Sequence, residues 1–214
     1  MRSVSPSRPA GVLGIAYVVF VVINIAGFNG GTPPDPHSTA QQISATYSAH
    51  RVGYMLGAFL DSLGSLLLIG FFYYLARRVD PNRGILSTLV IVGAVLATAL
   101  DLVWAAALGT AVQLAVLNAD PESVKAMVYL SQGVLWIIGT PLAVALIALG
   151  WLTIVSRGLP AWVGWTALVI GVLALLGVIA TAVTSSASGL TFGAYILSLV
   201  WTLATAIYLI ARPA

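Results

Sequence analysis

Residues 52–76 read VGYMLGAFLDSLGSLLLIGFFYYLA, an apolar run interrupted by a single carboxylate, Asp61. A helix needs about 20 mainly apolar residues to cross the hydrocarbon core of a bilayer, and this run is long enough. A charged side chain within such a helix usually faces the interior of a helix bundle rather than the lipid. The run therefore predicts a transmembrane helix whose Asp61 is directed at other helices.

The composition of the whole chain also indicates a membrane protein. The chain has 214 residues, of which 60% are hydrophobic and only 7% are charged, whereas a soluble domain carries about a quarter charged residues. A soluble core of this size cannot hide so much apolar surface, so lipid must be part of the solvent. The length suits a single bundle, and we treat residues 1–214 as one domain.

Five further apolar runs complete a set of six predicted spans. They are too long and too uniformly apolar for barrel strands, so the predicted fold class is all-α, a polytopic membrane helix bundle. The first run follows the basic segment MRSVSPSRPA, which also resembles the start of a signal peptide; its length and the lack of a clean A-x-A site favour a retained helix. The predicted spans are 10–28, 52–76, 84–109, 130–155, 161–184 and 190–211.

The arginines predict the orientation of the bundle. With six spans, the N-terminal tail, the loops after spans two and four, and the C-terminus all lie on one side, and this side carries most of the basic residues. The opposite side has Arg51 and Lys125 together with three acidic residues. We therefore predict a cell-membrane protein with both termini in the cytoplasm. The arginines on the predicted inner side are Arg2, Arg8, Arg77, Arg78, Arg83, Arg157 and Arg212.

Aspartate followed by proline occurs in three of the predicted loops. Asp suits the N-cap of a helix and Pro its first helical position. On the outer side, Asp35-Pro36 and Asp120-Pro121 predict short interfacial helices before spans two and four, with a plain loop as the alternative. On the inner side, Asp80-Pro81 predicts the start of span three.

A second intramembrane acid, Asp101, lies in the third span. A rise of about 1.5 Å per residue puts Asp61 and Asp101 at similar depths in the outer half of the bundle. Consecutive antiparallel spans are usually neighbours, so the two carboxylates are expected to lie close together; if they face one another, they either share a proton or one of them has a raised pKa. An ionised acid at the centre of a membrane helix costs about 2.5–3.5 kcal/mol, which favours a functional role over a merely structural one.

Polar and aromatic side chains form stripes on four of the predicted helices. Helical periodicity places Gly57, Tyr54, His50, Tyr47 and Ser65 on the face of Asp61, with Arg51 beside them. If these stripes converge, the outer half of the bundle contains a polar cavity; the alternative is that the hydroxyl groups only join neighbouring helices. The other stripes are Thr98, Asp101 and Trp104 in span three, Gln132, Trp136 and Thr140 in span four, and Thr191, Tyr195, Ser198, Thr202 and Thr205 in span six. The candidate ligand-binding or proton-binding residues are Asp61, Asp101, Tyr54, His50, Arg51, Ser65, Tyr195 and Ser198.

The sequence offers little support for catalysis or for a cofactor. It has no cysteine, and its two histidines, His37 and His50, form no ligand pair with a glutamate. No nucleophile elbow or phosphate-binding loop is present, and although Asp61 and Asp101 formally allow an aspartyl dyad, we disfavour an enzyme. Because the basic residues are spread over short loops, we expect no nucleic-acid partner.

The stretch ISATYSAHRVGYMLGAFLDSLGSLLLIGFFYYLARRVDPNRGIL, residues 43–86, resembles a family of uncharacterised bacterial membrane proteins of the domain-of-unknown-function kind. The shared layout is an outer segment ending in Arg51, a long span with Asp61 inside it, and an exit formed here by residues 74–80. The resemblance covers roughly residues 45–101. It implies a six-helix integral protein of the bacterial inner membrane, and it implies no activity.

Two functions remain open at this stage. In the first, a small solute or cation binds in the cavity or passes through it, with Asp61 as its ligand or as a proton carrier and Asp101 assisting. In the second, the chain is a structural or accessory subunit without a ligand site, in which the acids form fixed pairs such as Asp101 with Arg51. Besides membrane lipid, the second reading requires another membrane protein or a second copy of the chain as partner.

Overall fold

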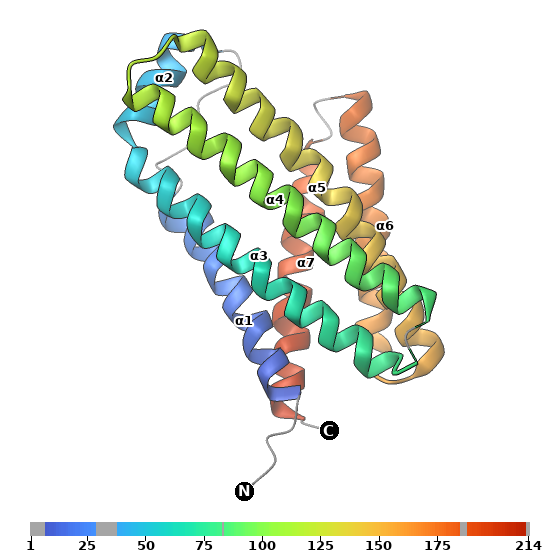
Figure 1. The fold of residues 1–214 in the computed structure, drawn as a ribbon. Coiled ribbons are helices and arrows are strands. Elements are labelled where there is room, and N and C mark those ends of the chain that lie inside the picture. Colours follow the sequence, from blue (N-terminus) through green and yellow to red (C-terminus); the bar gives the residue numbers. More distant parts are fainter. Residues whose placement is uncertain (1–6, 29–37, 83, 185–187, 213–214) are drawn as a thin grey trace, which may run out of the picture.

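A computed structural model describes residues 7–28, 38–82, 84–184 and 188–212 of the chain. All regular elements in these ranges are helical (Figure 1). They are α1 (Ser7–Ile23), the π-helical turn η1 (Asn24–Phe28), α2 (Ala40–Ala49), α3 (Arg51–Val79), α4 (Ile85–Val116), α5 (Pro121–Ser156), α6 (Ala161–Val183) and α7 (Ser188–Ala211).

Six of these helices, namely α1 extended by η1 together with α3, α4, α5, α6 and α7, are long and apolar enough to cross a membrane. The six predicted spans and the all-α fold class are therefore confirmed. The chain is a multi-pass membrane protein. Helices α4 and α5 are longer than predicted, with 32 and 36 residues. At about 1.5 Å per residue they extend roughly 48 and 54 Å, well beyond a hydrocarbon core of about 30 Å.

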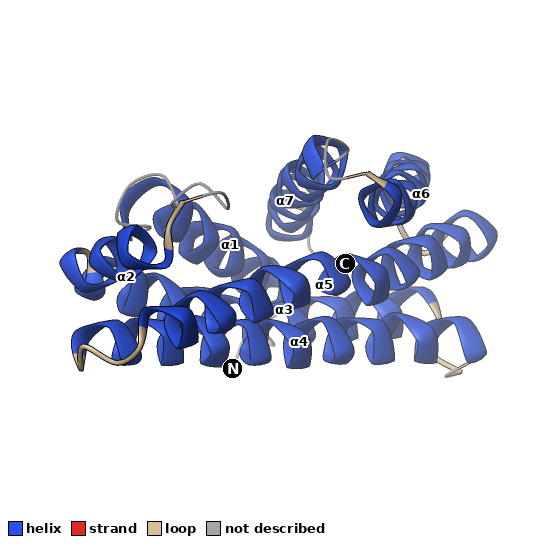
Figure 2. Cartoon of the chain, turned by 90° about the horizontal axis from the view of Figure 1, so that it is seen from above, coloured by secondary structure: helices blue, strands red, loops and turns tan. Residues whose placement is uncertain are grey.

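The six spans form a closed ring. Each span packs against its neighbours in chain order, and α1 also packs against α7, which closes the ring. Figure 2 shows α3, α4 and α5 on one side of the bundle and α1, α6 and α7 on the other. Part of the core is aromatic: Trp201 of α7 lies 6.2 Å from both Phe71 and Phe72 of α3, between ring centroids, and its Nε1 donates to the Val163 carbonyl of α6 at 3.1 Å.

At the end of the bundle opposite the termini, α2 packs against the ends of α3, α4 and α5 (Figure 1). We call this part the α2 end. Its core includes the buried side chains of Ile43, Tyr47, Tyr54, Val112 and Val124. The rings of Tyr47 and Tyr54 lie 4.4 Å apart between centroids. The upper part of the Asp61 face of α3 is therefore covered by α2.

The loop residues cap the helices in different ways. Asp120 is the N-cap of α5, as predicted: its side chain accepts a hydrogen bond from the Ser123 backbone N–H at 3.2 Å, and Pro121 is the first helical residue. The helix then continues unbroken, so the short helix expected before span four is the first part of α5 itself. The proposed start at Asp35-Pro36 lies outside the described residues.

The short helix expected before span two corresponds to α2, which begins at Ala40. Its N-cap is Thr39, which exchanges hydrogen bonds with Gln42 in a capping box. That this helix lies at the membrane interface remains a prediction.

The expected role of Asp80 as an N-cap was wrong. Asp80 is instead the C-cap of α3, and α4 begins after Gly84. The Asp80 carboxylate accepts hydrogen bonds within the turn, including one from the Gly84 N–H at 2.6 Å. Hydrogen bonds from the Ser87 hydroxyl and the Gly84 N–H hold the pKa of Asp80 below its ordinary value. Asp80 thus shapes the α3–α4 turn because its side chain folds over the turn's backbone.

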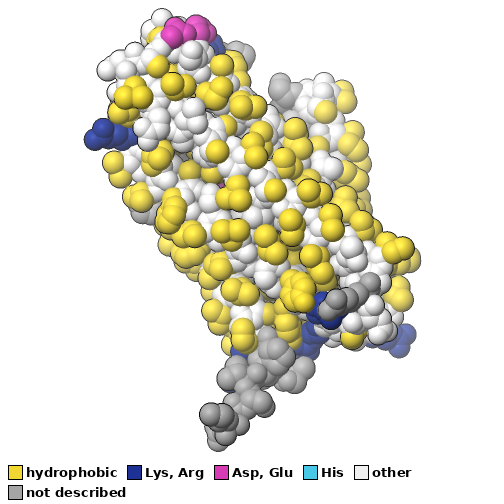
Figure 3. Space-filling model, viewed as in Figure 1, with side chains coloured by type: hydrophobic (Ala, Val, Ile, Leu, Met, Phe, Trp, Pro, Cys, Tyr) yellow, Lys and Arg dark blue, Asp and Glu magenta, His cyan; other side chains and the backbone are white. Residues whose placement is uncertain are grey.

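Charge is unevenly distributed between the two ends of the bundle. On the face drawn in Figure 3, Lys and Arg side chains gather mainly at the end that carries both termini, and acidic side chains lie at the α2 end. Arg77 and Arg78 lie in the last turn of α3, and Arg157 follows α5. This is the distribution from which the cytoplasmic position of the termini is predicted.

The cap at Asp120 gives a first prediction. Replacing Asp120 with alanine is expected to destabilise the protein by about 1 kcal/mol, because the Ser123 N–H then loses its side-chain acceptor and keeps only the backbone carbonyl of residue 120. The measurement is thermal unfolding of the purified protein. Glu122→Gln, a change in the same helical turn at an exposed side chain, serves as control and is expected to alter stability by less than about 0.5 kcal/mol. Equal effects of the two variants would show that the cap is energetically unimportant.

Candidate functional site

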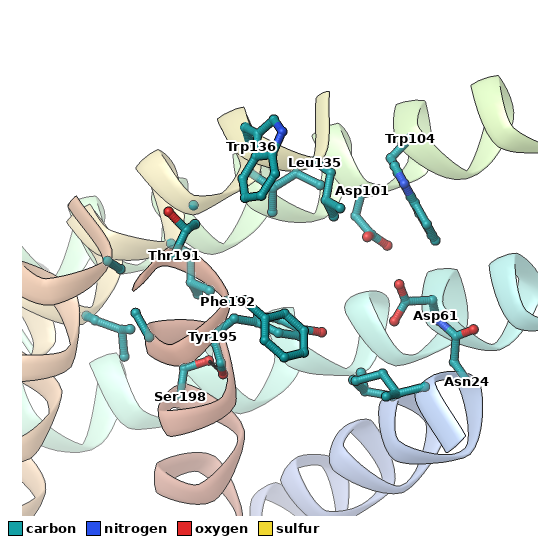
Figure 4. A pocket seen from close by; sticks show the side chains of 18 residues that line it. Asn24, Asp61, Asp101, Trp104, Leu135, Trp136, Thr191, Phe192, Tyr195 and Ser198 are labelled. Atoms are coloured by element: carbon teal, nitrogen blue, oxygen red, sulfur yellow. Dashed lines mark hydrogen bonds between the residues drawn. The ribbon is translucent and has the colours of Figure 1, made fainter. Parts of the chain in front are cut away.

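The ring of helices surrounds a cavity of about 240 Å³ (Figure 4). All six spans contribute to its lining, and most of the lining is apolar. The exceptions are side chains with oxygen or nitrogen atoms, which come from η1, α3, α4, α5 and α7. Apart from two tryptophans, these polar lining residues are Asn24, Asp61, Asp101, Thr191, Tyr195 and Ser198.

Asp101 is held in place by a buried hydrogen-bond network between α3 and α4. Its side chain is 7% exposed, and its Oδ2 accepts a hydrogen bond from the Ser65 hydroxyl at 2.8 Å. The Thr98 hydroxyl in turn donates to the Ser65 backbone carbonyl at 2.9 Å. Two side chains thus tie the neighbouring helices together at the level of Asp101 and fix the position of its carboxylate.

Asp61 lies opposite, on α3. Figure 4 shows the carboxylates of Asp61 and Asp101 turned toward one another, and they are near enough to interact electrostatically. The Asn24 side chain forms a hydrogen bond with Asp61. Asn24 is the first residue of η1, and π-helical turns within α-helices occur frequently at functional sites. The side-chain oxygen of Asn24 is buried and has no hydrogen-bond partner among the described residues.

Aromatic side chains form much of the remaining wall. Trp104 lies beside the two carboxylates, while Trp136, Phe192 and Tyr195 line the cavity farther along (Figure 4). The Tyr195 hydroxyl is hydrogen-bonded to that of Tyr17 on α1.

Three large apolar side chains line the cavity and are also exposed on the surface of the protein. They are Phe192 at 56%, Leu135 at 46% and Ile25 at 40%. They form an apolar rim contributed by α7, α5 and η1. We refer to these three residues as the rim.

The structure brings together only some of the residues proposed from the sequence. Asp61, Asp101, Tyr195 and Ser198 line the cavity, and Ser65 lies behind Asp101 as its hydrogen-bond donor. The other three candidates, Tyr54, His50 and Arg51, do not line it.

These three residues lie toward the α2 end of the bundle, away from the cavity. Tyr54 is buried against Tyr47 of α2. His50 and Arg51 are exposed at the junction of α2 and α3, about 15 Å along the helix from Asp61 at 1.5 Å per residue. Helical periodicity predicted the correct face of α3, but the part of that face nearest the α2 end packs against α2 and does not face the cavity.

Asn24 and Phe192 are among the lining residues of the cavity that sequence reasoning missed. Asn24 carried a signal, since it is the only amide in the apolar run 10–28. Phe192 carried none, because exposed aromatic residues near the ends of membrane helices are common.

The chemistry of the site is that of an acidic cavity in an apolar surrounding. Among the residues that the structure describes, no Lys, Arg or His side chain lines it, and no group of three or more His, Cys, Asp or Glu could hold a metal ion. Two carboxylates in such a place can hold a proton or a positively charged group.

The fold and the composition together define an integral membrane protein with six spans. The family comparison agrees: residues 10–212 match the domain of unknown function DUF4386, so the chain belongs to that family. This confirms the resemblance first noted in residues 43–86. No curated protein and no solved structure shows a match to the chain.

Proposed function

We propose that this protein binds a small solute or cation in the cavity between its helices and either retains it or passes it across the membrane. Asp61 is the residue that binds the ligand or exchanges a proton with it, and Asp101 shares this charge. The observation that carries the proposal is the convergence of two intramembrane carboxylates on one cavity.

The local partners of the acids support a ligand site over a structural pair. A structural role predicts a fixed cationic partner, such as Arg51 for Asp101. Arg51 is exposed at the start of α3, and the described partner of Asp101 is the neutral Ser65 hydroxyl. Buried charges are normally paired, and the described partners of Asp61 and Asp101 carry no positive charge. A bound proton or cation would compensate them.

The predicted orientation places ligand access on the outer side. With both termini in the cytoplasm, the α2 end faces outward. The cavity lies within about 15 Å of the start of α7 and of the end of α6, both on that side, at 1.5 Å per residue. Asp101, Tyr17 and Tyr195 interact electrostatically with Asp61. A proton gained or lost at Asp61 would therefore change the electrostatic energy of these three side chains. Coupling of ligand binding to protonation is therefore part of the proposal.

Native mass spectrometry of the protein extracted with its lipids and solutes tests this function. We expect a reproducible bound mass that is retained by the wild type and by Glu122→Gln, and is lost or reduced at least about tenfold in Asp61→Asn, a difference of about 1.4 kcal/mol. The two variants each remove one carboxylate, but Glu122 is exposed in the first turn of α5. Equal retention by all three proteins, or no bound solute in any of them, would refute the proposal, and a stoichiometric second polypeptide would favour the accessory-subunit function.

A further inference from the structure

We infer that the ligand of the cavity is a primary organic ammonium ion with a small apolar body. Its charged end is held by Asp61 and Asp101, and its apolar body lies against the aromatic and aliphatic wall. This inference rests on the proposed function and specifies the chemical class of the ligand.

The charge of the ligand follows from the lining. Two carboxylates point into the cavity, and among the described residues no basic side chain lines it. An anion would therefore be repelled. A neutral solute would leave both carboxylates with only neutral partners, the Ser65 hydroxyl and the Asn24 amide. A cation is the class of ligand that compensates both acids at once.

The number of acceptors favours an ammonium group. A primary ammonium carries three N–H donors and no acceptor. The cavity offers two carboxylates close together, whose four oxygens can accept these N–H groups, and one of the four already accepts a hydrogen bond from the Ser65 hydroxyl. The Asn24 amide, which also lines the cavity, forms a hydrogen bond with Asp61.

The aromatic residues point to the same class. Trp104 lies beside the two carboxylates in Figure 4. A tryptophan face attracts ammonium groups through its quadrupole, and this attraction strengthens where water is excluded. Carboxylates and an indole ring beside one another form a typical environment for an organic cation.

A bare metal ion fits the cavity less well. Ca²⁺ takes about 6–8 oxygen ligands, many of them carboxylates, whereas the described residues hold no cluster of three acids. Most of the wall is apolar, including Ile138, Leu142 and Leu146. A metal ion would leave these side chains without contacts, whereas ligand pockets usually combine an apolar wall with a few polar groups that orient the ligand.

The size and rim of the cavity limit the apolar body. A volume of about 240 Å³ corresponds to roughly eight water molecules at about 30 Å³ each. A short alkyl chain or a single ring fits this space. The exposed rim of Ile25, Leu135 and Phe192 is apolar. An amphiphilic amine that enters past the rim can keep its hydrophobic part in contact with these side chains instead of with water.

Calorimetric titration of the full-length protein in lipid nanodiscs tests the inference. The probes are phenethylamine and hexylamine, the corresponding alcohols, the anion hydrocinnamate, and the chlorides of sodium and calcium; empty nanodiscs correct for partitioning into lipid. We expect at least one amine to bind at least about tenfold more tightly than its alcohol, and hydrocinnamate not to bind.

Three variants locate the binding. Asp61→Asn and Asp101→Asn are expected to weaken amine binding at least about tenfold and to leave alcohol binding unchanged. Glu122→Gln is the matched control and is expected to leave both unchanged. Size-exclusion profiles identical to that of the wild type establish that the variants are folded. A third substitution, Asn24→Leu, removes the amide that is hydrogen-bonded to Asp61 and is expected to weaken amine binding without affecting the alcohol.

The possible failures are distinguishable. Equal binding of amines and alcohols, unaffected by the variants, would overturn the ammonium inference while a site for apolar solutes remains. Binding of sodium or calcium that requires Asp61, without binding of amines, would overturn the inference and keep the proposed function. If no probe binds and the mass spectra also contain no solute, both fail.

Discussion

Replacing Gly150 with alanine is expected to destabilise the protein by about 1–3 kcal/mol, whereas the same replacement at Gly133, in the same helix, is expected to be tolerated. A Cβ atom at Gly150 would lie 2.7 Å from both the Gly164 carbonyl oxygen and the Leu168 backbone nitrogen of α6. These are backbone atoms, so no change of rotamer relieves the contact and the two helices must separate. A Cβ atom at Gly133 meets no atom within 4 Å.

The contact at Gly150 belongs to a longer seam between α5 and α6. A Cβ atom at Gly164 would lie 3.0 Å from the Gly150 carbonyl oxygen, and one at Gly171 would lie 2.9 Å from the Ala143 carbonyl oxygen. Small residues of this kind allow membrane helices to approach closely, and packing rather than the hydrophobic effect then holds the helices together. Because α5 and α6 both line the cavity, their separation should also weaken ligand binding.

Thermal unfolding in detergent, followed by the loss of the monodisperse size-exclusion peak, measures this difference. Gly133→Ala is expected to unfold at the wild-type temperature or slightly above it, since alanine favours helix by up to about 1 kcal/mol. Equal unfolding temperatures for the two variants would mean that α5 and α6 do not approach one another as described.

The transmembrane organisation was predictable because each span is encoded in a contiguous run. The length of each apolar run predicts a membrane-spanning helix. The rule that consecutive helices are usually neighbours predicts that α3 lies beside α4. The closure of the ring by α1 and α7 was not predictable in this way. It depends on contacts between the first and last spans, such as the close approach of Gly14 to Ala206, which no local pattern reports.

The location of the site was only partly predictable. Helical periodicity identified the inward faces of α3 and α7, hence Asp61, Tyr195 and Ser198. It gave no information on what each face meets along its length, so Tyr54 was assigned to the cavity although α2 covers it. Depth estimates were also limited by the helix ends. Span three was predicted to end at residue 109, whereas α4 continues to Val116, so Asp101 lies about 22 Å from the end of its helix at about 1.5 Å per residue.

The Ser65–Asp101 hydrogen bond is expected to be one of the strongest single polar contacts in the bundle. Ser65→Ala and Asp101→Ala should each lower the free energy of unfolding, and the double variant should lose less than the sum of the two. The expected coupling is about 1.5–3 kcal/mol, typical of a buried hydrogen bond to a charged group. The two atoms lie 2.8 Å apart, and both residues are buried. A double-mutant cycle on thermal or denaturant unfolding measures this coupling, and simple additivity would show that the bond contributes nothing.

Asp61→Asn is the comparison for this cycle. Asp61 is less buried than Asp101, and its described side-chain partner is the Asn24 amide, which an asparagine at position 61 can still meet. Loss of an uncompensated acid should therefore change stability by less than about 0.5 kcal/mol or increase it, since an intramembrane acid is costly. If the Asp61→Asn variant is more stable than the wild type but no longer retains the bound solute, the wild type keeps this carboxylate for function at the expense of stability. If Asp61→Asn instead destabilises the fold as much as Asp101→Ala does, both acids are structural and the accessory-subunit function is favoured.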